Sequence, residues 1–349
     1  MPLLVVLFVA AAAATWAAGV ALSKTTDALD IRLGLGQELG GLLLLAIAGS
    51  LPELAITVSA ASQGNLGLAA GNLIGGIAVQ TMVLFLCDVE VGPERPLTYL
   101  VGALSPVLEG LLVVLVVAGV EMGALLRPST AIGGVVSPAS LAIVLVWAAG
   151  VYTIDRARRD PRWSVSMPGS RPGRRHRRDR PAPDRPHPFA GRSTAHVWLV
   201  FGVACAVTLV AGVVLEMSGN RLADHLGING VIFGATVLAA ATALPEISSG
   251  IGAVRLGDHA LAVGDVFGGN AFQVCLFLVA DLVAGQPVLP SSGDANGWLA
   301  ALGIVLTVVY SFGVIVRLKR AYVRLGVDSL LVVVLFALGI AGLYAIQHP

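Results

Sequence analysis

Long apolar runs alternate with short polar breaks along almost the whole chain. Ten such runs are present, at residues 3–22, 38–62, 66–87, 97–119, 131–154, 196–216, 228–253, 259–284, 295–316 and 326–346. A helix needs about 20 mainly apolar residues to cross the hydrocarbon core of a bilayer. The pattern therefore predicts an all-α polytopic membrane protein with ten transmembrane helices, five on each side of one polar interruption.

The first run lies where a secretory signal would lie, but its composition differs from one. No basic residue precedes it, and its apolar stretch is longer than the core of a signal peptide. We therefore expect residues 3–22 to form a retained transmembrane helix.

The polar interruption at residues 155–194 carries twelve of the twenty arginines and seven prolines. Such a segment cannot bury an apolar core, so we expect a disordered linker between a first membrane repeat at 1–154 and a second at 195–349. A regulatory or nucleic-acid role is the alternative. With the linker in the cytoplasm, both termini lie outside and twenty basic residues lie inside, which leaves only Arg127 and Arg221 outside. This asymmetry agrees with the positive-inside rule, and it persists at eight against two without the linker.

Composition supports membrane insertion and excludes several classes of protein. Hydrophobic residues make up 56% of the chain and charged residues only 12%, about half the share of a soluble domain, and the mean hydropathy is +0.86. A net charge of +1 offers no basis for nucleic-acid binding. The three cysteines, Cys87, Cys205 and Cys275, are far apart and form no disulfide or zinc pattern. The sequence indicates the lipid bilayer as its surroundings, with no cofactor and no obligate protein partner.

An internal repeat links the two halves of the chain. Residues 46–81 and 239–274 align without a gap at an offset of 193, and fourteen of the 36 positions are identical. The matches include Pro-Glu pairs at 52–53 and 245–246 in mid-membrane. Because each half contains five spans, the second half enters the membrane from the opposite side. The sequence therefore predicts two inverted-topology repeats, an architecture common among secondary transporters, which place their site near the midplane.

The repeated Pro-Glu pairs supply the chemistry of a cation site. Ionisable residues inside a membrane usually face a partner or a water-filled cavity. Pro52 and Pro245 have no N–H, so each frees a carbonyl four residues earlier, at Ala48 and Ala241. Ser50 and Thr242 add hydroxyl oxygens within the same turns. Calcium prefers six to eight oxygen ligands, and two carboxylates balance its charge, so we expect Glu53 and Glu246 to bind Ca²⁺ together. The alternative is that each glutamate is protonated and only joins helices.

Glycine motifs follow each Pro-Glu pair. The sequences GNLIGG at 71–76 and GDVFGG at 264–269 place small residues one turn apart. Small residues let membrane helices approach closely. We expect Gly75, Gly76, Gly268 and Gly269 to pack helices together, with access of the backbone to the ion as the alternative role.

These two segments resemble the α-repeats of the Ca²⁺/cation antiporter superfamily, in particular the prokaryotic sodium/calcium exchangers. That family carries roughly G-T-S-x-P-E and then G-N-x-x-G-S-N once per half. The resemblance covers the two 36-residue segments closely, and the remainder by the number of spans and the position of the linker. It implies alternating access, in which the first and sixth spans slide against the rest. It also implies ion sites between the second, third, seventh and eighth spans.

The resemblance implies roles for single residues. Glu53 and Glu246 match the two calcium-binding glutamates, while Ala48 and Ala241 match motif glycines and Ser50 and Thr242 match motif hydroxyls. Other positions depart from the pattern. Gly49 stands in place of a threonine, Ala243 in place of a serine, and Gly76 and Gly269 in place of serines that help to bind sodium in the family. Gln80 and Gln273 stand where the family has an Asn and an Asp. Asn72 fits the pattern, whereas its counterpart is Asp265. These departures leave the calcium centre complete and remove oxygens from the monovalent sites.

The favoured function is a secondary antiporter that moves Ca²⁺ in exchange for Na⁺, with a Ca²⁺/H⁺ antiporter of the same fold as the alternative. Asp265 either carries a coupling charge or replaces the packing hydrogen bond of Asn72. A cation channel is a more distant alternative, because it needs a continuous pore. No metalloprotease, serine-nucleophile or paired-aspartate pattern supports an enzyme. We expect Glu109, Glu216 and Asp281 to be interface or helix-terminal charges.

Overall fold

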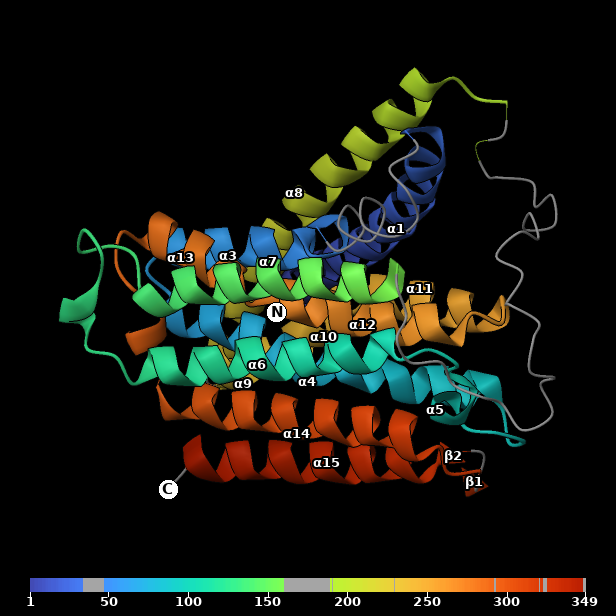
Figure 1. Ribbon diagram of the computed structural model, residues 1–349. Helices are drawn as coiled ribbons and strands as arrows, with labels where there is room; N and C mark the ends of the chain where they lie inside the picture. Colours follow the sequence, from blue (N-terminus) through green and yellow to red (C-terminus); the bar gives the residue numbers. More distant parts are fainter. Residues whose placement is uncertain are drawn as a thin grey trace.

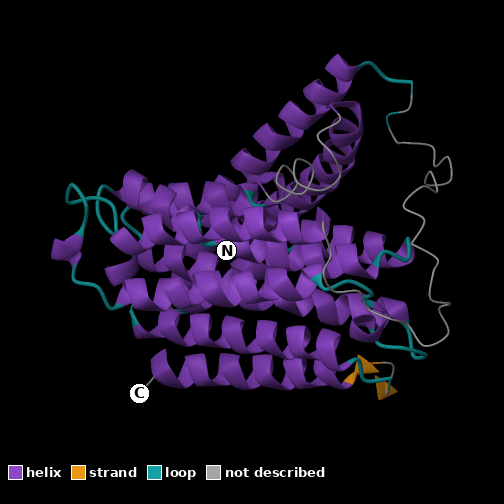
Figure 2. Cartoon of the chain, viewed as in Figure 1, coloured by secondary structure: helices purple, strands orange, loops and turns teal. Residues whose placement is uncertain are grey.

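The computed structural model of the chain describes residues 1–33, 47–159, 189, 191–228, 230–291, 293–319, 321–322 and 325–347. Within these ranges the chain is almost entirely helical, apart from one small pair of strands (Figure 2). Most long helices lie side by side in one direction. Two of them, α1 and α8, lean away from this bundle together (Figure 1).

The first half contains α1 (Pro2–Leu33), α3 (Leu51–Ser62), α4 (Leu66–Val91), α5 (Leu97–Leu100), α6 (Ser105–Ala124), the 3-10 turn η2 (Pro128–Thr130) and α7 (Pro138–Arg159). The second half contains α8 (Thr194–Leu226), α9 (Gly230–Phe233), the π-helical segment η3 (Gly234–Leu238), α10 (Ala239–Thr242), α11 (Leu244–Arg255), α12 (His259–Gln273), α13 (Leu276–Ala284), the 3-10 turn η4 (Leu289–Ser291), α14 (Asp294–Val316) and α15 (Val327–Gln347). The antiparallel strands β1 (Ala321–Tyr322) and β2 (Leu325–Gly326) join the last two long helices.

Eight helices among the described residues are long and apolar enough to cross a membrane. A ninth span is formed if the bent pair 230–242 and 244–255 is one crossing. Of the expected second span, residues 47–49 and 51–62 are helical, and 34–46 lie outside the described residues. The prediction of a polytopic helical membrane protein is confirmed, whereas the count of ten spans stays a prediction.

Prolines set two helix starts later than the hydrophobic runs suggested. The expected span at 97–119 is divided into the short helix α5 and the long helix α6, whose first turn contains Pro106. The expected span at 131–154 begins only at Pro138. Proline lacks the N–H that a helix interior needs but fits the first turn, so it marks a start within an unbroken apolar run.

The N-terminal boundary of the expected linker also moves. Helix α7 continues to Arg159, beyond the expected start of the linker at 155. Residues 160–188 and 190, which carry most of that segment, lie outside the described residues.

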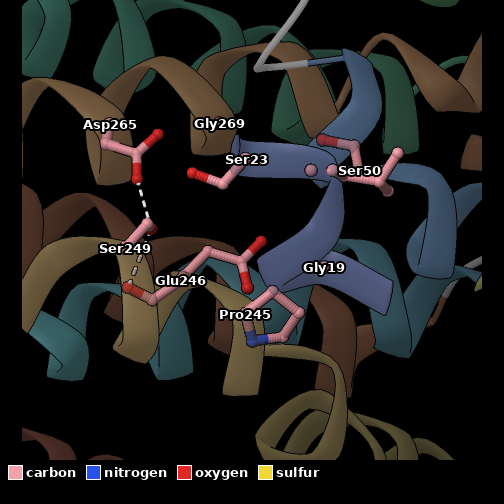
Figure 3. A pocket seen from close by; sticks show the side chains of 10 residues that line it. Gly19, Ser23, Ser50, Pro245, Glu246, Ser249, Asp265 and Gly269 are labelled. Carbon is pink, nitrogen blue, oxygen red and sulfur yellow. Dashed lines mark hydrogen bonds between the residues drawn. The ribbon is translucent and has the colours of Figure 1, made fainter. Parts of the chain in front are cut away.

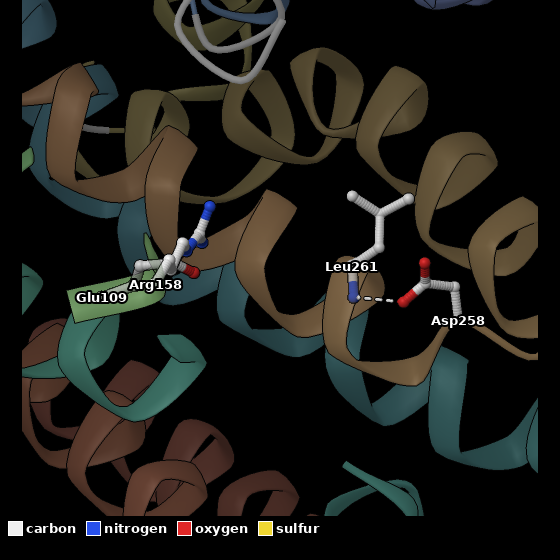
Figure 4. A network of polar contacts seen from close by, with 4 residues as sticks. All are labelled: Glu109, Arg158, Asp258 and Leu261. Atoms are coloured by element: carbon white, nitrogen blue, oxygen red, sulfur yellow. Dashed lines mark hydrogen bonds and ion pairs between the residues drawn. The ribbon is translucent and has the colours of Figure 1, made fainter. Parts of the chain in front are cut away.

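Two buried acids join helices through polar contacts. Glu109 on α6 pairs with Arg158 on α7, as Figure 4 shows. The same figure shows a third acid, the exposed Asp258, which caps the N-terminus of α12 by accepting the Leu261 N–H at 3.0 Å. Asp281, in the last turns of α13, accepts the N–H groups of Ser137 at 2.9 Å and of Val288 at 2.7 Å. The interface and helix-end roles expected for Glu109 and Asp281 agree with these contacts.

Of the two roles expected for Glu216, the structure shows the interface role and not a position at a helix end. Helix α8 extends to Leu226, so this residue lies well inside it and is fully buried. Its carboxylate accepts hydrogen bonds from Ser59 of α3 at 2.8 Å and from Gln63, the C-cap residue of α3, at 3.0 Å. The polar run after residue 216 had suggested a loop, but burial against α3 lets those residues stay helical.

Helix α4 is the centre of the bundle. It contacts α3, α11, α12, α14 and the segment from α9 to η3. Most of its residues are buried, and many are small, such as Ala69, Ala70, Gly71, Gly75 and Gly76. Small side chains allow this many helices to approach one axis. The Pro-Glu segments of both halves are thereby held against one central helix.

Candidate functional site

Both Pro-Glu pairs lie in the first turn of a helix that follows a break. In the first half the helical residues 47–49 end at Ser50, and α3 begins at Leu51. In the second half α10 ends at Thr242, and α11 begins after Ala243 at an angle of 46°. Since neither proline donates an N–H, the helical hydrogen-bond pattern is interrupted just before each glutamate. The two carboxylates therefore lie at helix N-termini, where the helix dipole favours negative charge.

A π-helical segment precedes the second break. Residues Gly234–Leu238 form η3, and this segment packs directly on α4, where a Cβ at Gly75 would lie 2.4 Å from Ala235. Single π-helical turns are often found at functional sites. The segment shifts the register of the helix that carries the second Pro-Glu pair.

Glu53 is fully buried at the beginning of α3. Gln80 on α4 donates a hydrogen bond from Nε2 to Glu53 Oε1 at 3.1 Å. Thr242, from the other repeat, lies beside the carboxylate. The second oxygen, Oε2, has no hydrogen-bond partner among the described residues. A buried carboxylate oxygen without a partner is costly, so the site is better matched to a bound cation or proton.

Glu246 lines a cavity instead of being enclosed. The cavity is bounded by Gly19, Leu22 and Ser23 of α1, by Gly49 and Ser50, and by residues of α11 and α12. Figure 3 shows Glu246, Ser249, Asp265 and Ser23 around this space. Helix α1 packs directly against the break between α10 and α11, since a Cβ at Gly19 would lie only 2.4 Å from the Pro245 ring. The second carboxylate thus has access to a polar space that the first does not reach directly.

The two repeats meet at these glutamates. Glu246 interacts electrostatically with Glu53 and with Asp265. Gly49 of the first motif faces the second glutamate, with a Cβ at that position 3.9 Å from Glu246 Oε1. Like charges inside a low-dielectric region repel strongly unless a cation or a proton compensates them. The arrangement is suited to hold a positive charge between the halves.

Asp265 lies beside this pair on α12. It accepts a hydrogen bond from Ser249 Oγ at 2.6 Å, and the same hydroxyl lies 3.2 Å from the Glu246 carbonyl oxygen. Asp265 lines the same cavity as Glu246. Its side chain therefore faces the cavity, and its hydrogen bond with Ser249 also joins α12 to α11.

The equivalent glutamines of the two repeats have different partners. Gln80 contacts Glu53, whereas Gln273 donates to the backbone carbonyls of Asn72 at 3.3 Å and Leu73 at 2.9 Å. The buried amide of Asn72 has no hydrogen-bond partner among the described residues. Gln80 therefore contacts the Glu53 carboxylate, whereas Gln273 bonds to the backbone of α4 and holds that helix in place.

The glycine pairs differ in the same way. At Gly75 an added Cβ would lie 2.4 Å from Ala235, and at Gly76 it would lie 2.3 Å from the Gln273 amide. At Gly268 and Gly269 nothing among the described residues lies within 4 Å of an added Cβ, and Gly269 lines the cavity. Close packing expected at both pairs is therefore found at the first pair only, and the second pair leaves open space.

Three residues of the site were not identified from the sequence. Ser249 follows Glu246 by one helical turn, and Ser23 reaches the cavity from α1. Asn270 donates to Thr81 Oγ1 at 3.2 Å and ends the glycine motif of the second half. The i, i+3 spacing from Glu246 and the final Asn of the family pattern were available signals for two of them. Nothing in the sequence indicated that α1 contributes Ser23.

The donor set limits what the site can hold. The described part of the chain contains no group of three or more His, Cys, Asp or Glu side chains placed to bind one metal ion. A divalent ion at the two glutamates would take its remaining ligands from hydroxyl, amide or backbone oxygens, or from water. Such oxygen ligands suit calcium, which accepts flexible, mixed oxygen shells.

Comparison with known proteins identifies relatives over nearly the full length. The family model described as "Sodium/calcium exchanger protein" matches residues 3–154 and 196–347. CaxA of Alkalimonas amylolytica is 25% identical over 296 residues, covering 82% of this chain and 84% of that protein. YrbG, an inner membrane protein of Escherichia coli (strain K12), is 26% identical over 258 residues, covering 73% of this chain and 70% of that protein.

Solved structures share the fold. The H⁺/Ca²⁺ exchanger CAX superposes with a TM-score of 0.63 at 13% identity, over 98% of this chain and 88% of that one. The sodium-calcium exchanger NCX_Mj gives a TM-score of 0.62 at 14% identity, over 98% and 99%. YfkE gives 0.65 at 14% identity, over 97% and 92%. The two family-model matches leave out residues 155–195.

Proposed function

Because the chain belongs to the sodium/calcium exchanger family, we propose that it is a secondary antiporter that moves Ca²⁺ across the membrane in exchange for Na⁺. This family consists of ion transporters and not of enzymes. Its members include antiporters, and the chain is an integral membrane protein of that family. The ion exchanged and the residues that bind it are the parts proposed here.

The observation that carries the proposal is the meeting of two carboxylates, one from each repeat, at two proline-broken helices. Glu53 and Glu246 interact electrostatically, and the cavity beside Glu246 gives an ion a route to them. A carboxylate at the middle of a membrane helix costs about 2.5–3.5 kcal/mol, which a bound divalent cation compensates. We assign Ca²⁺ to the space between these two side chains, with Ser50, Thr242 and the carbonyls of Ala48 and Ala241 as further oxygen donors, beside Gly49.

In our proposal, the pair of helices α1 and α8 provides alternating access. These two helices pack on each other and lean away from the bundle, and α1 forms one wall of the cavity (Figure 1). In our proposal they move as a pair against the bundle, which opens the site to one side of the membrane at a time. The inverted repeats and ten spans expected from the sequence are part of this proposal, as is the orientation with both termini outside and the linker in the cytoplasm.

A proton is the second candidate for the counter-ion. Gly76 and Gly269 stand where the family pattern has hydroxyl ligands, and Na⁺ needs neutral oxygens. Protons need only acids, and Asp265 adds a second carboxylate to the cavity that Glu246 lines. The fold also superposes on an H⁺/Ca²⁺ exchanger as closely as on a sodium-calcium exchanger. Sodium is kept as the first proposal because the family resemblance in the repeats favours it.

Uptake of radioactive calcium into proteoliposomes tests the proposal. Vesicles loaded with Na⁺ at equal pH on both sides should accumulate calcium when diluted into sodium-free buffer. Vesicles with a pH gradient and no sodium should not. Uptake that follows only the pH gradient would assign the proton as counter-ion. Uptake that is linear with calcium and independent of both gradients would indicate a channel and contradict antiport.

The surroundings of the protein are proposed by the same reasoning. YrbG is an inner membrane protein, and the composition of the chain suits a bilayer, so we place this chain in the plasma (inner) membrane. The arginine-rich linker is assigned a topological role. Replacing residues 165–188 with a short flexible segment should then preserve calcium uptake.

A further inference from the structure

Three positive side chains surround one aromatic ring at the end of the bundle. The charged groups of Arg95, Arg317 and Lys319 lie 5.7, 5.3 and 5.9 Å from the centre of the Tyr99 ring. We propose that these three side chains, the Tyr99 cluster, bind the phosphate of an anionic phospholipid headgroup. The inference is independent of the ion that the protein transports.

The cluster is built from two separate parts of the chain. Tyr99 and Arg95 belong to the short segment around α5, whereas Arg317 and Lys319 follow the end of α14. Arg317 donates from Nη2 to the Tyr99 carbonyl oxygen at 2.6 Å. This contact joins the two segments and fixes the guanidinium beside the ring. The positive charges are therefore held in place before any ligand arrives.

The backbone at Arg317 is unusual in a way that supports a role for its position. Its φ is +54°, and it is the only residue other than glycine with a positive φ among the described residues. Its N–H bonds to the Gly313 carbonyl at 2.8 Å, which ends α14 in a left-handed cap. Glycine normally takes that position, since a side chain there is strained. Such strain is often kept where the side chain has a function.

Four acidic side chains, Asp88, Glu90, Glu94 and Asp328, lie in the segments around the cluster, and the first two are engaged elsewhere. Asp88 accepts the backbone N–H groups of Leu97 at 2.6 Å and Gly326 at 2.7 Å, and Glu90 bonds to Arg255. Neither Arg95 nor Lys319 forms an ion pair within the part of the chain that the structure describes, and both are exposed. Three adjacent positive charges repel one another. An anion from outside the chain would relieve that repulsion.

The surface beside the cluster suits a lipid rather than a free anion. Directly before Arg317, the last turns of α14 expose large apolar side chains: Phe312 is 63%, Ile315 61% and Val316 44% accessible. This surface is where acyl chains lie if the helix spans the bilayer. Aromatic rings such as Tyr99 are enriched at the membrane interface, and guanidinium groups hold phosphate oxygens in pairs. A headgroup on the cluster and an acyl chain on α14 would fit one phospholipid.

The position of the cluster agrees with the leaflet that contains anionic lipid. Figure 1 shows α5 and the strands β1 and β2 at the same end of the bundle as the end of α7, where the arginine-rich linker begins. In the proposed orientation that end is cytoplasmic. The cytoplasmic leaflet carries negative surface charge and attracts basic residues next to transmembrane helices.

Native mass spectrometry of the intact protein in a non-ionic detergent tests this inference. The protein is titrated with dipalmitoyl phosphatidylglycerol, and with the matching phosphatidylcholine as neutral lipid, and bound lipids are counted. The variant Arg95→Gln with Lys319→Gln removes two charges but keeps the structural bond of Arg317. Each cation near a membrane surface contributes a factor of about five to binding, so the variant should bind phosphatidylglycerol about 25-fold more weakly. Phosphatidylcholine binding should be unchanged.

The control variant is Arg127→Gln with Arg221→Gln, which loses the same charge at exposed positions elsewhere. It should bind phosphatidylglycerol like the original protein. Equal losses in both variants would show that only diffuse charge attracts the lipid, and would overturn the site. Displacement of the bound lipid by millimolar inorganic phosphate would overturn it too, because the cluster would then be a free-phosphate site.

Discussion

The two Pro-Glu segments are related by sequence but have different surroundings. Glu53 is fully buried and held by Gln80, whereas Glu246 lines a cavity together with Asp265. The repeated motif places a carboxylate at each helix break. The neighbours of each carboxylate then decide whether it is enclosed or open to a cavity. A duplicated sequence thus supplies two similar groups, and tertiary packing makes them unequal.

The same inequality extends along α4 and α12. In the first half, Gly75 and Gly76 contact the second half closely, and α4 lies at the centre of the bundle. In the second half, Gly268 and Gly269 leave space beside the cavity. The glycines of α4 are therefore closely packed, whereas those of α12 leave open space on the second half's side of the cavity. The following predictions test this difference, beginning with the largest expected effect.

The glutamates should be equally essential although their surroundings differ. Glu53→Gln and Glu246→Gln should each abolish calcium transport, because each removes one of two charges that face the ion. Calcium uptake into proteoliposomes measures this. Glu121→Gln is the matched control, since it makes the same change on α6 at a partly exposed position outside the cavity. Near-normal flux in either glutamine variant would contradict a shared site.

Replacing each of the two equivalent glutamines should have a different effect on calcium affinity. Gln80→Ala removes a hydrogen bond to a buried carboxylate, a contact of about 1.5–3 kcal/mol, so calcium affinity should fall roughly tenfold or more. Gln273→Ala removes bonds to backbone carbonyls of α4 and should leave calcium affinity near the original value. Isothermal titration calorimetry in detergent measures both. Equal losses in affinity would argue against the assigned difference.

Alanine substitutions in the two glycine pairs should differ in their effect on the stability of the protein. Gly75→Ala forces a methyl group against the backbone of Ala235 and should destabilise the protein by about 1–3 kcal/mol. Gly268→Ala meets open space and should be neutral or slightly stabilising, because alanine favours a helix more than glycine does. Thermal melting in detergent compares the two. A larger loss for Gly268→Ala than for Gly75→Ala would refute the described packing.

The smallest expected effect concerns Asp265, which stands where the first repeat has Asn72. Asp265→Asn keeps a hydrogen-bond acceptor for Ser249 but removes the charge from the cavity. If Asp265 takes part in coupling, the variant should change the pH dependence of exchange or the charge moved per calcium, with calcium affinity nearly intact. Solid-supported membrane currents and uptake at several pH values measure this. An unchanged pH profile and current would leave Asp265 as a packing residue.

Much of the fold could be predicted because membrane helices follow local rules. Length and hydropathy located the spans, and Pro52 and Pro245 indicated the two breaks, since a missing N–H acts within one turn. Errors arose where distant partners decided the outcome. The polar residues after position 216 stay helical because Glu216 is buried against Ser59 of α3 and the C-cap residue Gln63. No local signal reveals a partner more than 150 residues away.

The sequence by itself determined that this chain crosses a membrane, that it has two related halves and that each half carries one glutamate beside a proline. These properties depend on residue type and spacing alone. Only the tertiary structure decided that Gln80 contacts Glu53 while Gln273 braces α4, and that Ser23 of α1 joins Ser249 and Asp265 at one cavity. Those outcomes depend on which helices approach one another and at what angle, because a side chain's role follows from what lies within a few ångströms of it.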